Sequence, residues 1–486
     1  MSAPCLAALD IGTTSVKACL FTPELALVSR GVCEYALDTA EERVEAEAKT
    51  YLDAVQSAMR QALAAADGWR PAALGVTTQG ETFVPVDQDG KPLRPFMVWL
   101  DGRAQAEAEA YASQTTQEAF YETTGLPDIS GALPLCKLYW LKRHEPEVFD
   151  RARRFLLLED YLLLWLTGRC VSERSLQTST GWYDIVRDQP CMPSDIGADR
   201  LPELVECGET VGGLRPEAAA LLGLEAGIPV SAGAMDQTAA ALAAGVDGSG
   251  VVCETTGTAL VMAACADRPT FSRGHRVTVY RHALPGKYLY LPLSNTGGMA
   301  LTWFRDTFCP DVNGYEALDA MAAEVPCGCE GLAFLPFLSG SVDPDFRPQA
   351  RAAFFGARLS TTRAHFARSV MESVAFLLRD FLGLLEPLGV TVREIRSLGG
   401  GARSALWQQI KADVCGRTFR VPACPEAAAM GAALLAGWGT GLVEPGVCAL
   451  AGPMAAYHPN PAHETAYDQA YTLYRRLYEA VSPLYD

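Results

Sequence analysis

The sequence lacks the segments that would place the protein in a membrane or outside the cell. No apolar run reaches the roughly 20 uninterrupted residues that a membrane-spanning helix needs. The apolar stretch at 154–168, for example, carries Glu159 and Asp160 inside it. The first residues contain no basic segment, and Asp10 ends the apolar run that follows, which argues against a signal peptide. We therefore expect a soluble, cytoplasmic protein with no membrane partner.

An excess of basic charge is also missing. The formal net charge of −17 argues against nucleic acid or an anionic membrane as the partner, because both require basic surface. The charge leaves a phosphorylated small molecule open as a ligand, since one pocket can be locally positive. There is no long charge block, Gln/Asn tract or Ser/Gly linker, so we expect no disordered region.

Cysteine patterns for metal or redox sites are absent, although the chain has 15 cysteines. The only close pair is Cys327 and Cys329, whose spacing fits neither a zinc knuckle nor a CxxC redox site. Others, such as Cys19 and Cys253, lie in apolar runs where a thiol behaves as a small hydrophobic group. Reduced thiols of a cytosolic protein are the expected state.

With 486 residues, the chain is too long for one ordinary core, and its pattern predicts two related α/β halves. The first half predicts strands at 6–11, 16–21 and 25–37, a helix at 41–66, and strands at 71–78 and 81–90. The second half opens on a similar stretch at 248–264 and continues with a helix at 365–389 and a strand into a triple glycine at 394–404. We expect domains at 1–246 and 247–440, then a tail at 441–486 with a Pro-rich stretch and a helix at 466–481.

The turn after the first strand has the composition of a phosphate site. Backbone N–H groups in a Gly-rich turn can hold an anion, hydroxyls add donors, and a lysine adds positive charge. An acid beside them makes sense if Mg²⁺ lies between it and phosphate. The alternative is a tight hairpin with an incidental acid. The residues are Asp10, Gly12, Thr13, Thr14, Ser15 and Lys17.

A second turn of this kind, Thr255 to Thr258, strengthens the phosphate interpretation. Two such turns in two halves predict a nucleotide held across a cleft. The chain has no G-x-x-x-x-G-K-[ST] segment, which excludes a Walker loop. The triple glycine at 399–401 would let backbone approach a ligand at a helix start, or it could be a packing cluster.

Candidate chemical groups lie between these turns. Asp236 and Gln237 follow a strand and a small-residue turn, so Asp236 could accept the proton of an attacking hydroxyl; the alternative is a helix N-cap. Gln79 and Glu81 at a strand end could orient a polyhydroxylated ligand, as could Trp99 and Asp101. For Asp101 the alternative is an ion pair with Arg103 that fixes a loop, and for Trp99 it is core packing.

The segments 10–18, 232–242, 255–260 and 398–404 together resemble the FGGY carbohydrate kinases of the actin-like superfamily. Residues 133–144, with Lys137 and Trp140, are similar to one family signature. Residues 352–373 are similar to the second, with Gly356, His365, Phe366, Ser369 and Glu372 in place. Ala132 and Ala357 depart from these signatures. The resemblance implies two actin-like (ribonuclease H-like) domains that flank a nucleotide and sugar cleft and close about a hinge.

The resemblance also implies ATP and Mg²⁺ as cofactors. Asp236 would be the base, and Asp10 would hold Mg²⁺ through water. The β- and γ-phosphates would meet the turn of Gly12, Thr13, Thr14, Ser15 and Lys17 from one half and Thr256, Gly257 and Thr258 from the other. Along the adenosine would lie Gly400, Gly401 and Ala402, with Asn295 or Ser404 nearby.

The substrate is less defined by the resemblance. Xylulokinases usually have Met-His, and glycerol kinases Arg-Glu, where this chain has Gly80-Glu81. The missing arginine favours a ligand larger than glycerol, so we predict transfer to a pentulose such as xylulose. The alternatives are a glycerol or other polyol kinase and a non-catalytic actin-like ATP-binding regulator. A homodimer is one option for the assembly.

Overall fold

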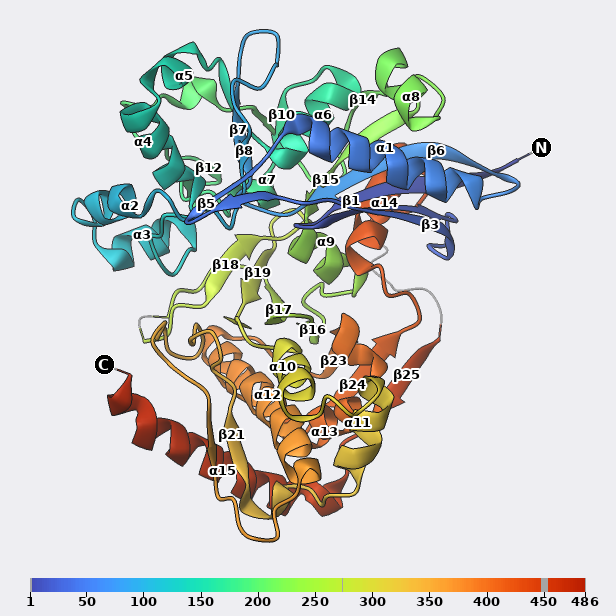
Figure 1. Ribbon diagram of the computed structural model, residues 1–486. Helices are drawn as coiled ribbons and strands as arrows, with labels where there is room; N and C mark the ends of the chain where they lie inside the picture. The colour runs from blue at the N-terminus through green and yellow to red at the C-terminus, as the bar shows by residue number, and fades with distance from the viewer. Residues whose placement is uncertain (1, 273, 447–452, 486) are drawn as a thin grey trace.

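The computed structural model describes residues 2–272, 274–446 and 453–485, and these form two α/β lobes, one above the other in Figure 1. The lobe drawn in blue and green holds most of the first half of the chain, and the lobe drawn in yellow to red holds most of the second. The predicted two-domain α/β architecture is confirmed.

The first lobe is built on a six-stranded sheet of order β14-β15-β6-β1-β2-β3. Strands β1, β2 and β3 form an antiparallel meander, whereas β6 runs parallel to β1, and β15 parallel to β6. This register places Asp10 opposite Lys17 at the β1–β2 turn. The strands are β1 (Ala3–Ile11), β2 (Ser15–Phe21), β3 (Leu27–Glu34), β6 (Trp69–Thr78), β14 (Thr210–Gly213) and β15 (Pro229–Met235).

Helices cover both faces of this sheet. On one face, α1 (Ala48–Ala64), α6 (Leu158–Thr167) and α8 (Pro216–Leu222) share a core with the strands. The apolar side of α1 supplies Tyr51, Val55 and Met59, as its 3.6-residue spacing predicts. On the other face lie α9 (Asp236–Ala243) and α14 (Ala427–Thr440), both rich in alanine.

The helix predicted at 41–66 is wrong in its first part. Arg43–Ala46 form strand β5, which pairs with β4 (Asp38–Ala40) and β8 (Phe96–Met97), and α1 begins only at Ala48. The buried Glu45 accepts hydrogen bonds from Arg94 at 2.5 Å and Arg103 at 2.6 Å. These distant ion pairs stabilise an extended chain, and local helix propensity cannot foresee them.

An insertion extends the first lobe beside β5 and β8. Its helices and the adjoining strands enclose a separate core around Trp182, Leu135 and Phe83. Its elements are β7 (Phe83–Val86), α2 (Gln105–Ala112), α3 (Gln117–Thr124), α4 (Pro134–His144), α5 (Pro146–Arg151), β9 (Arg154–Leu157), β10 (Val171–Glu173), α7 (Arg174–Gln177), β11 (Tyr183–Asp184), β12 (Gln189–Pro190) and β13 (Glu203–Val205).

The second lobe repeats the plan of the first with the strand order β18-β19-β17-β16-β23-β24-β25. Strand β16 is antiparallel to β17 and parallel to β23, just as β1 is to β2 and β6. The strands are β16 (Val251–Thr256), β17 (Leu260–Ala266), β18 (Thr278–Arg281), β19 (Tyr288–Leu291), β20 (Leu293–Ser294), β23 (Glu394–Leu398), β24 (Thr418–Pro422) and β25 (Met454–Tyr457).

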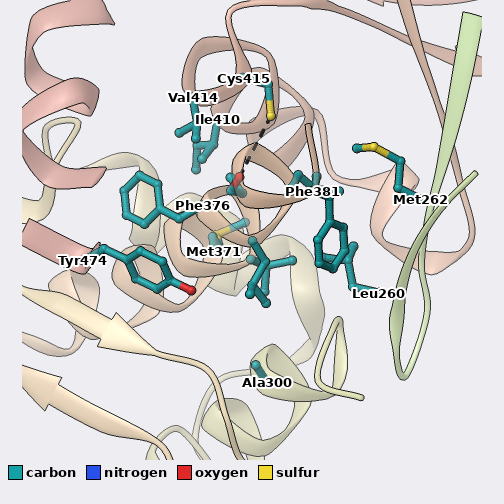
Figure 2. Packing of buried hydrophobic residues seen from close by; sticks show 14 of the residues in the cluster. Leu260, Met262, Ala300, Met371, Phe376, Phe381, Ile410, Val414, Cys415 and Tyr474 are labelled. Atoms are coloured by element: carbon teal, nitrogen blue, oxygen red, sulfur yellow. Dashed lines mark hydrogen bonds between the residues drawn. The ribbon is translucent and has the colours of Figure 1, made fainter. Parts of the chain in front are cut away.

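The core of the second lobe forms between this sheet and its helices. Figure 2 shows Phe376 and Phe381 of α12 (Arg363–Leu385) packed near Ile410 of α13 and Leu260 of β17. The remaining elements are α10 (Met299–Phe308), α11 (Gly314–Ala323), β21 (Ala333–Leu335), β22 (Ala353–Phe355), α13 (Ala405–Cys415) and α15 (Glu464–Val481). Among the described residues, no helix combines the length and apolar character needed to cross a bilayer.

Helix α14 crosses between the lobes. It follows β24 of the second lobe, yet it packs on β1, β6 and β15 of the first lobe, beside α9 (Figure 1). The chain then returns, because β25 pairs with β24 and α15 joins the core of the second lobe. The predicted tail is therefore partly built into this lobe; residues 447–452 of its Pro-rich stretch lie outside the described residues.

The contact between α14 and β6 predicts one sensitive position. A Cβ at Gly75 would lie 2.1 Å from the carbonyl oxygen of Ala432, so Gly75→Ala must push α14 away from the sheet. We expect a loss of roughly 1–3 kcal/mol of stability by thermal or urea unfolding. Gly383→Ala in α12 is the matched control. A Cβ built there would have no atom within 4 Å outside its own helix turn, so the change should be neutral or slightly stabilising. Equal stability of the two variants would contradict this packing.

Candidate active site

The β1–β2 turn forms the first part of the site. Its backbone is closed by the Gly12 N–H, which donates to the Ser15 carbonyl at 3.0 Å. Asp10 is buried at the end of β1, and the Lys17 Nζ lies 3.6 Å from its Oδ2. Burial raises the pKa of Asp10, although Lys17 acts in the opposite direction. Thr14 is exposed at the tip, so the turn presents backbone and hydroxyl groups beside a buried carboxylate.

Glu426 belongs to this cluster and was not foreseen from the sequence. It immediately precedes α14, and its carboxylate lies 3.1 Å from the Lys17 Nζ and 2.5 Å from the Arg30 Nη1. Burial opposes its charged form, but Lys17 and Arg30 outweigh burial and lower the pKa of Glu426. No motif contains it, and it meets Lys17 only because α14 crosses to the first lobe.

The β16–β17 turn forms the second part and is fixed from below by a buried ion pair. The Lys411 Nζ donates to the Glu254 Oε1 and to the Thr256 Oγ1, both at 2.7 Å, and Thr256 in turn donates to the Glu254 Oε2 at 2.7 Å. The Glu254 and Lys411 side chains are fully buried. Thr256 is thereby held at the turn, with Gly257 and the exposed Thr258 beyond it.

A cavity of about 790 Å³ opens beside this second turn. The triple glycine packs closely against the turn beside this cavity. A Cβ at Gly401 would lie 2.7 Å from the Thr256 side chain, so glycine is needed for this approach. Of the predicted nucleotide-side residues, Thr256, Gly257, Thr258, Gly400, Gly401 and Ser404 line the cavity, whereas Asn295 and Ala402 are not among its lining residues. Lining residues that the sequence did not indicate are Gly298, Met299, Leu301, Thr302, Asn313, Gly314, Tyr315, Glu316, Asp319, Arg403 and Trp407.

The helix predicted directly after the triple glycine begins later than expected. Gly400–Arg403 form a 3₁₀ turn, and α13 starts at Ala405 with Ser404 as its N-cap. The Ser404 Oγ accepts the Trp407 N–H at 3.0 Å. Gly399 has a φ of 79°, which a glycine adopts without strain, so the chain can turn tightly against Thr256.

Asp236 is the first residue of α9, directly after β15. Met235 is the N-cap, so the alternative role of Asp236 as the cap does not apply. Its carboxylate accepts the Gln237 N–H at 2.6 Å. Burial, together with the charge of Asp10, raises the pKa of Asp236 to about 7. A carboxyl group with this pKa can exchange a proton near neutral pH.

Glu81 is the second acid beside Asp236. It follows Gln79 and Gly80 at the end of β6 and has a φ of 62°, a strained conformation for a residue with a side chain. Burial and the charge of Asp236 raise the pKa of Glu81 to about 7, with Lys137 acting against them. Lys137 is fully buried and its Nζ donates to the Val98 carbonyl at 2.7 Å. Lys137, the lysine of the first family signature, thus supports the loop at Val98.

Trp99 and Asp101 follow this loop and have different surroundings. The Trp99 Nε1–H donates to the Thr13 Oγ1 at 3.0 Å, and the ring is 37% exposed, so Trp99 is not a core residue. It joins the loop after β8 to the β1–β2 turn. Asp101 is fully buried and accepts from Arg103 and from the Val44 N–H, which agrees with the loop-fixing alternative.

Tyr280 brings the second lobe to the same place, and no sequence motif indicated it. It lies on β18, where the neighbouring Val279 N–H donates to the Gly125 carbonyl of the first lobe at 2.8 Å. Burial raises the pKa of Tyr280 well above its usual value, and the charges of Glu81 and Asp236 add to this effect. Tyr280 of the second lobe therefore faces Glu81 and Asp236 of the first lobe.

Comparison with known proteins identifies this arrangement. The N-terminal domain of the FGGY family of carbohydrate kinases matches residues 5–243, and its C-terminal domain matches residues 251–440. The chain belongs to the FGGY family of carbohydrate kinases. Membership makes it a phosphotransferase with the two ribonuclease H-like domains that the sequence resemblance implied.

Relatives match along most of the chain. A xylulose kinase of Lactococcus lactis is 27% identical over 98% of this chain and 97% of its own length. A gluconokinase of Bacillus subtilis is 28% identical over 90% of this chain and 88% of its own. Among solved structures, the xylulose kinase of Rhodospirillum rubrum has a TM-score of 0.90 at 30% identity and covers 99% of both chains.

The buried Glu254–Lys411 pair predicts a large effect on stability. Lys411→Met leaves the Glu254 charge unpaired in the core, so we expect a loss of about 3–5 kcal/mol in urea unfolding. The double variant Glu254→Leu/Lys411→Met removes both charges and should recover much of that loss. If Lys411→Met alone were as stable as the parent, the pairing of Glu254 with Lys411 would be contradicted.

Proposed function

We propose that this protein transfers the γ-phosphoryl group of ATP to a hydroxyl of a small neutral ketose, with a pentulose such as xylulose as the best candidate. The observation that carries the proposal is the position of Asp236. It is electrostatically coupled to Asp10 of the first phosphate turn and to Glu81 of the sugar-side loop. A base there can meet both an incoming alcohol and a phosphoryl group.

ATP is assigned to the cavity beside the second turn. Gly257 and Thr258 line this cavity, and their backbone amides and the Thr258 hydroxyl would bind phosphates. Asp319 lines the same cavity, and its Oδ1 is a buried oxygen without a hydrogen-bond partner among the described residues. A nucleoside hydroxyl is a suitable donor for that oxygen.

The residues around Asp10 fit a magnesium ion. The charge of Asp10 raises the pKa of Asp236, so the two carboxyl groups interact. Lys17 lies near both Asp10 and Glu426, so it compensates the negative charge here only in part. Carboxylate oxygens are the ligands that Mg²⁺ prefers in proteins. Asp10 would hold the ion through water, and Mg²⁺ would neutralise charge on the phosphates. Lys17 and the hydroxyls of Thr13 and Thr14 would orient the transferred group.

Asp236 would act on the sugar. In phosphoryl transfer, a carboxylate base orients the nucleophilic hydroxyl and takes its proton as the new bond forms. Gln237, next on the same helix, and Gln79 would contact other hydroxyls. The link between Trp99 and Thr13 would keep the sugar loop and the phosphate turn in fixed relation.

The charge of the pocket favours a neutral sugar over a sugar acid. Glu81 and Asp236 are both acidic, and the adjacent Lys137 already donates to the Val98 carbonyl. A gluconate carboxylate would meet the like charge of Glu81 and Asp236, and Lys137 already compensates Glu81, whereas the hydroxyls and carbonyl of a ketose suit acidic acceptors. The xylulose kinase relatives agree with this choice, and the gluconokinase relatives make gluconate the competing substrate to test. The cytoplasmic location stays a prediction.

The role of the base is tested by Asp236→Asn. Without the proton acceptor, we expect turnover to fall by about 10²–10⁴-fold, while sugar and ATP binding by calorimetry stay close to the parent. Near-normal turnover would show that another group is the base.

The pH dependence tests the same group. A base must be unprotonated, and the pKa of Asp236 is raised to about 7 by burial and Asp10. We therefore expect kcat/KM for the sugar to fall about tenfold per pH unit below that pKa and to level off above it. Because the pKa of Glu81 is also near 7, the profile is measured in Glu81→Gln too. Loss of the acid limb in that variant would assign it to Glu81 instead.

The substrate class is tested by ADP release with xylulose, ribulose, glycerol and gluconate. We expect a ketopentose to give the highest kcat/KM and gluconate the lowest. Glu81→Ala should raise the KM for the sugar much more than the KM for ATP, because Glu81 lies on the sugar side. Preference for gluconate would overturn the neutral-sugar assignment, and no turnover with any sugar would favour a non-catalytic regulator.

A further inference from the structure

The end of β15, which carries the chain into Asp236, has no neighbouring strand on its outer edge among the described residues. Strand β14 pairs with β15 only at residues 229–231, and the last backbone contacts on that side are made by Ala232, whose N–H donates to the Glu209 carbonyl and whose carbonyl accepts the Gly208 N–H, both at 2.9 Å. The N–H groups of Gly233 and Met235 lie beyond these contacts. Buried backbone donors of this kind need other acceptors.

The same stretch contains an irregularity in its pairing with β6. Ser231 is opposite Gly75 and Ala234 is opposite Thr77, so three steps along β15 match two along β6. A β-bulge of this type bends a strand and re-aims the side chains that follow it. Gly233 permits the bend, because a Cβ there would lie 1.6 Å from the Val76 carbonyl oxygen.

Side chains from two other elements replace the missing strand. The Glu159 Oε1, on α6, accepts the Gly233 N–H at 2.8 Å. The Ser175 Oγ, on α7, accepts the Met235 N–H at 3.0 Å and donates to the Glu173 Oε1 at 2.9 Å. Glu173 is itself held by the Leu176 N–H at 2.7 Å and the Cys207 thiol at 2.9 Å. Glu159, Glu173 and Ser175 are fully buried.

We propose that Glu159 and the Ser175–Glu173 pair are positioning residues that hold the bulged end of β15 and thereby set the place of the Asp236 carboxylate. Met235 is the residue before Asp236, so a shift of its amide moves the start of α9 directly. The proposal rests on the assignment of Asp236 as the base. These residues touch neither sugar nor nucleotide and act through the backbone alone.

The protonation of Glu159 fits this role. Burial raises its pKa well above the usual value, and the nearby Glu173 adds to the effect. Glu173 accepts several hydrogen bonds and is the better site for the negative charge. A glutamine keeps an acceptor oxygen in the place of the Oε1 that accepts the Gly233 N–H, so it should replace Glu159. Leucine, of similar size, removes the acceptor.

The experiment compares Glu159→Leu, Glu159→Gln and Ser175→Ala in the full chain, with kinetics normalised to folded protein. We expect kcat to fall on the order of 10- to 100-fold in Glu159→Leu and Ser175→Ala, because small displacements of a catalytic group have large effects on rate. The KM for ATP should stay within about twofold, and Glu159→Gln should retain near-parent kcat. Ser373→Ala is the control: this fully buried hydroxyl donates to the Val370 carbonyl at 2.7 Å within α12 of the second lobe, so its removal should leave kcat of the folded enzyme unchanged.

Each outcome decides the proposal. Parent kcat in Ser175→Ala, or a Glu159→Gln variant as impaired as Glu159→Leu, would overturn it. If Glu159→Leu does not fold, Ser175→Ala and Glu159→Gln still give the answer. An inactive Asp236→Asn variant beside a fully active Ser175→Ala variant would remove only the positioning role, whereas an active Asp236→Asn variant would remove the base assignment itself.

Discussion

The close contact of α9 with α14 is the constraint on which the site depends. A Cβ at Gly431 of α14 would lie 2.1 Å from the Ala239 carbonyl of α9, so the two helices touch backbone to backbone. Alanine and glycine along both helices make this approach possible. Because α9 begins at Asp236 and α14 directly follows Glu426, the contact brings the proposed base and the partner of Lys17 to one end of the helix pair. Larger side chains there would separate the groups that the chemistry needs together.

Charge at this point is arranged by burial rather than by pairing. Asp10, Asp236 and Glu81 are desolvated, and Lys17 and Lys137 compensate them only in part, since each also contacts another acceptor. A site with surplus negative charge favours a divalent cation and the proton of a hydroxyl. The raised pKa of Asp236 and the proposed magnesium site at Asp10 thus have one physical cause.

Sequence patterns predicted the local parts of this structure well and the distant contacts poorly. Strand, turn and glycine at 6–17 and 251–260 are local features, and the sheet register places them as expected. Glu426, Asp319 and Tyr280 reach the site from elements far away in the chain, so no spacing indicated them. The helix pattern at 41–66 fails over β5 because Glu45 pairs with the distant Arg94 and Arg103. For Asp101 the sequence leaves a sugar ligand and an ion pair with Arg103 both open, and in the structure its carboxylate accepts from Arg103 and the Val44 N–H.

The two ends of the cleft differ in how they are built, and this difference explains what can vary. At the Gly/Thr turns and the triple glycine, backbone approaches backbone, and a Cβ at Gly399 would lie 2.9 Å from the Thr256 carbonyl oxygen, so few substitutions are possible. At the proposed sugar end, side chains on a strained loop, above all Glu81, define the candidate pocket, and one substitution changes its charge. Substrate preference can therefore change while the fold stays.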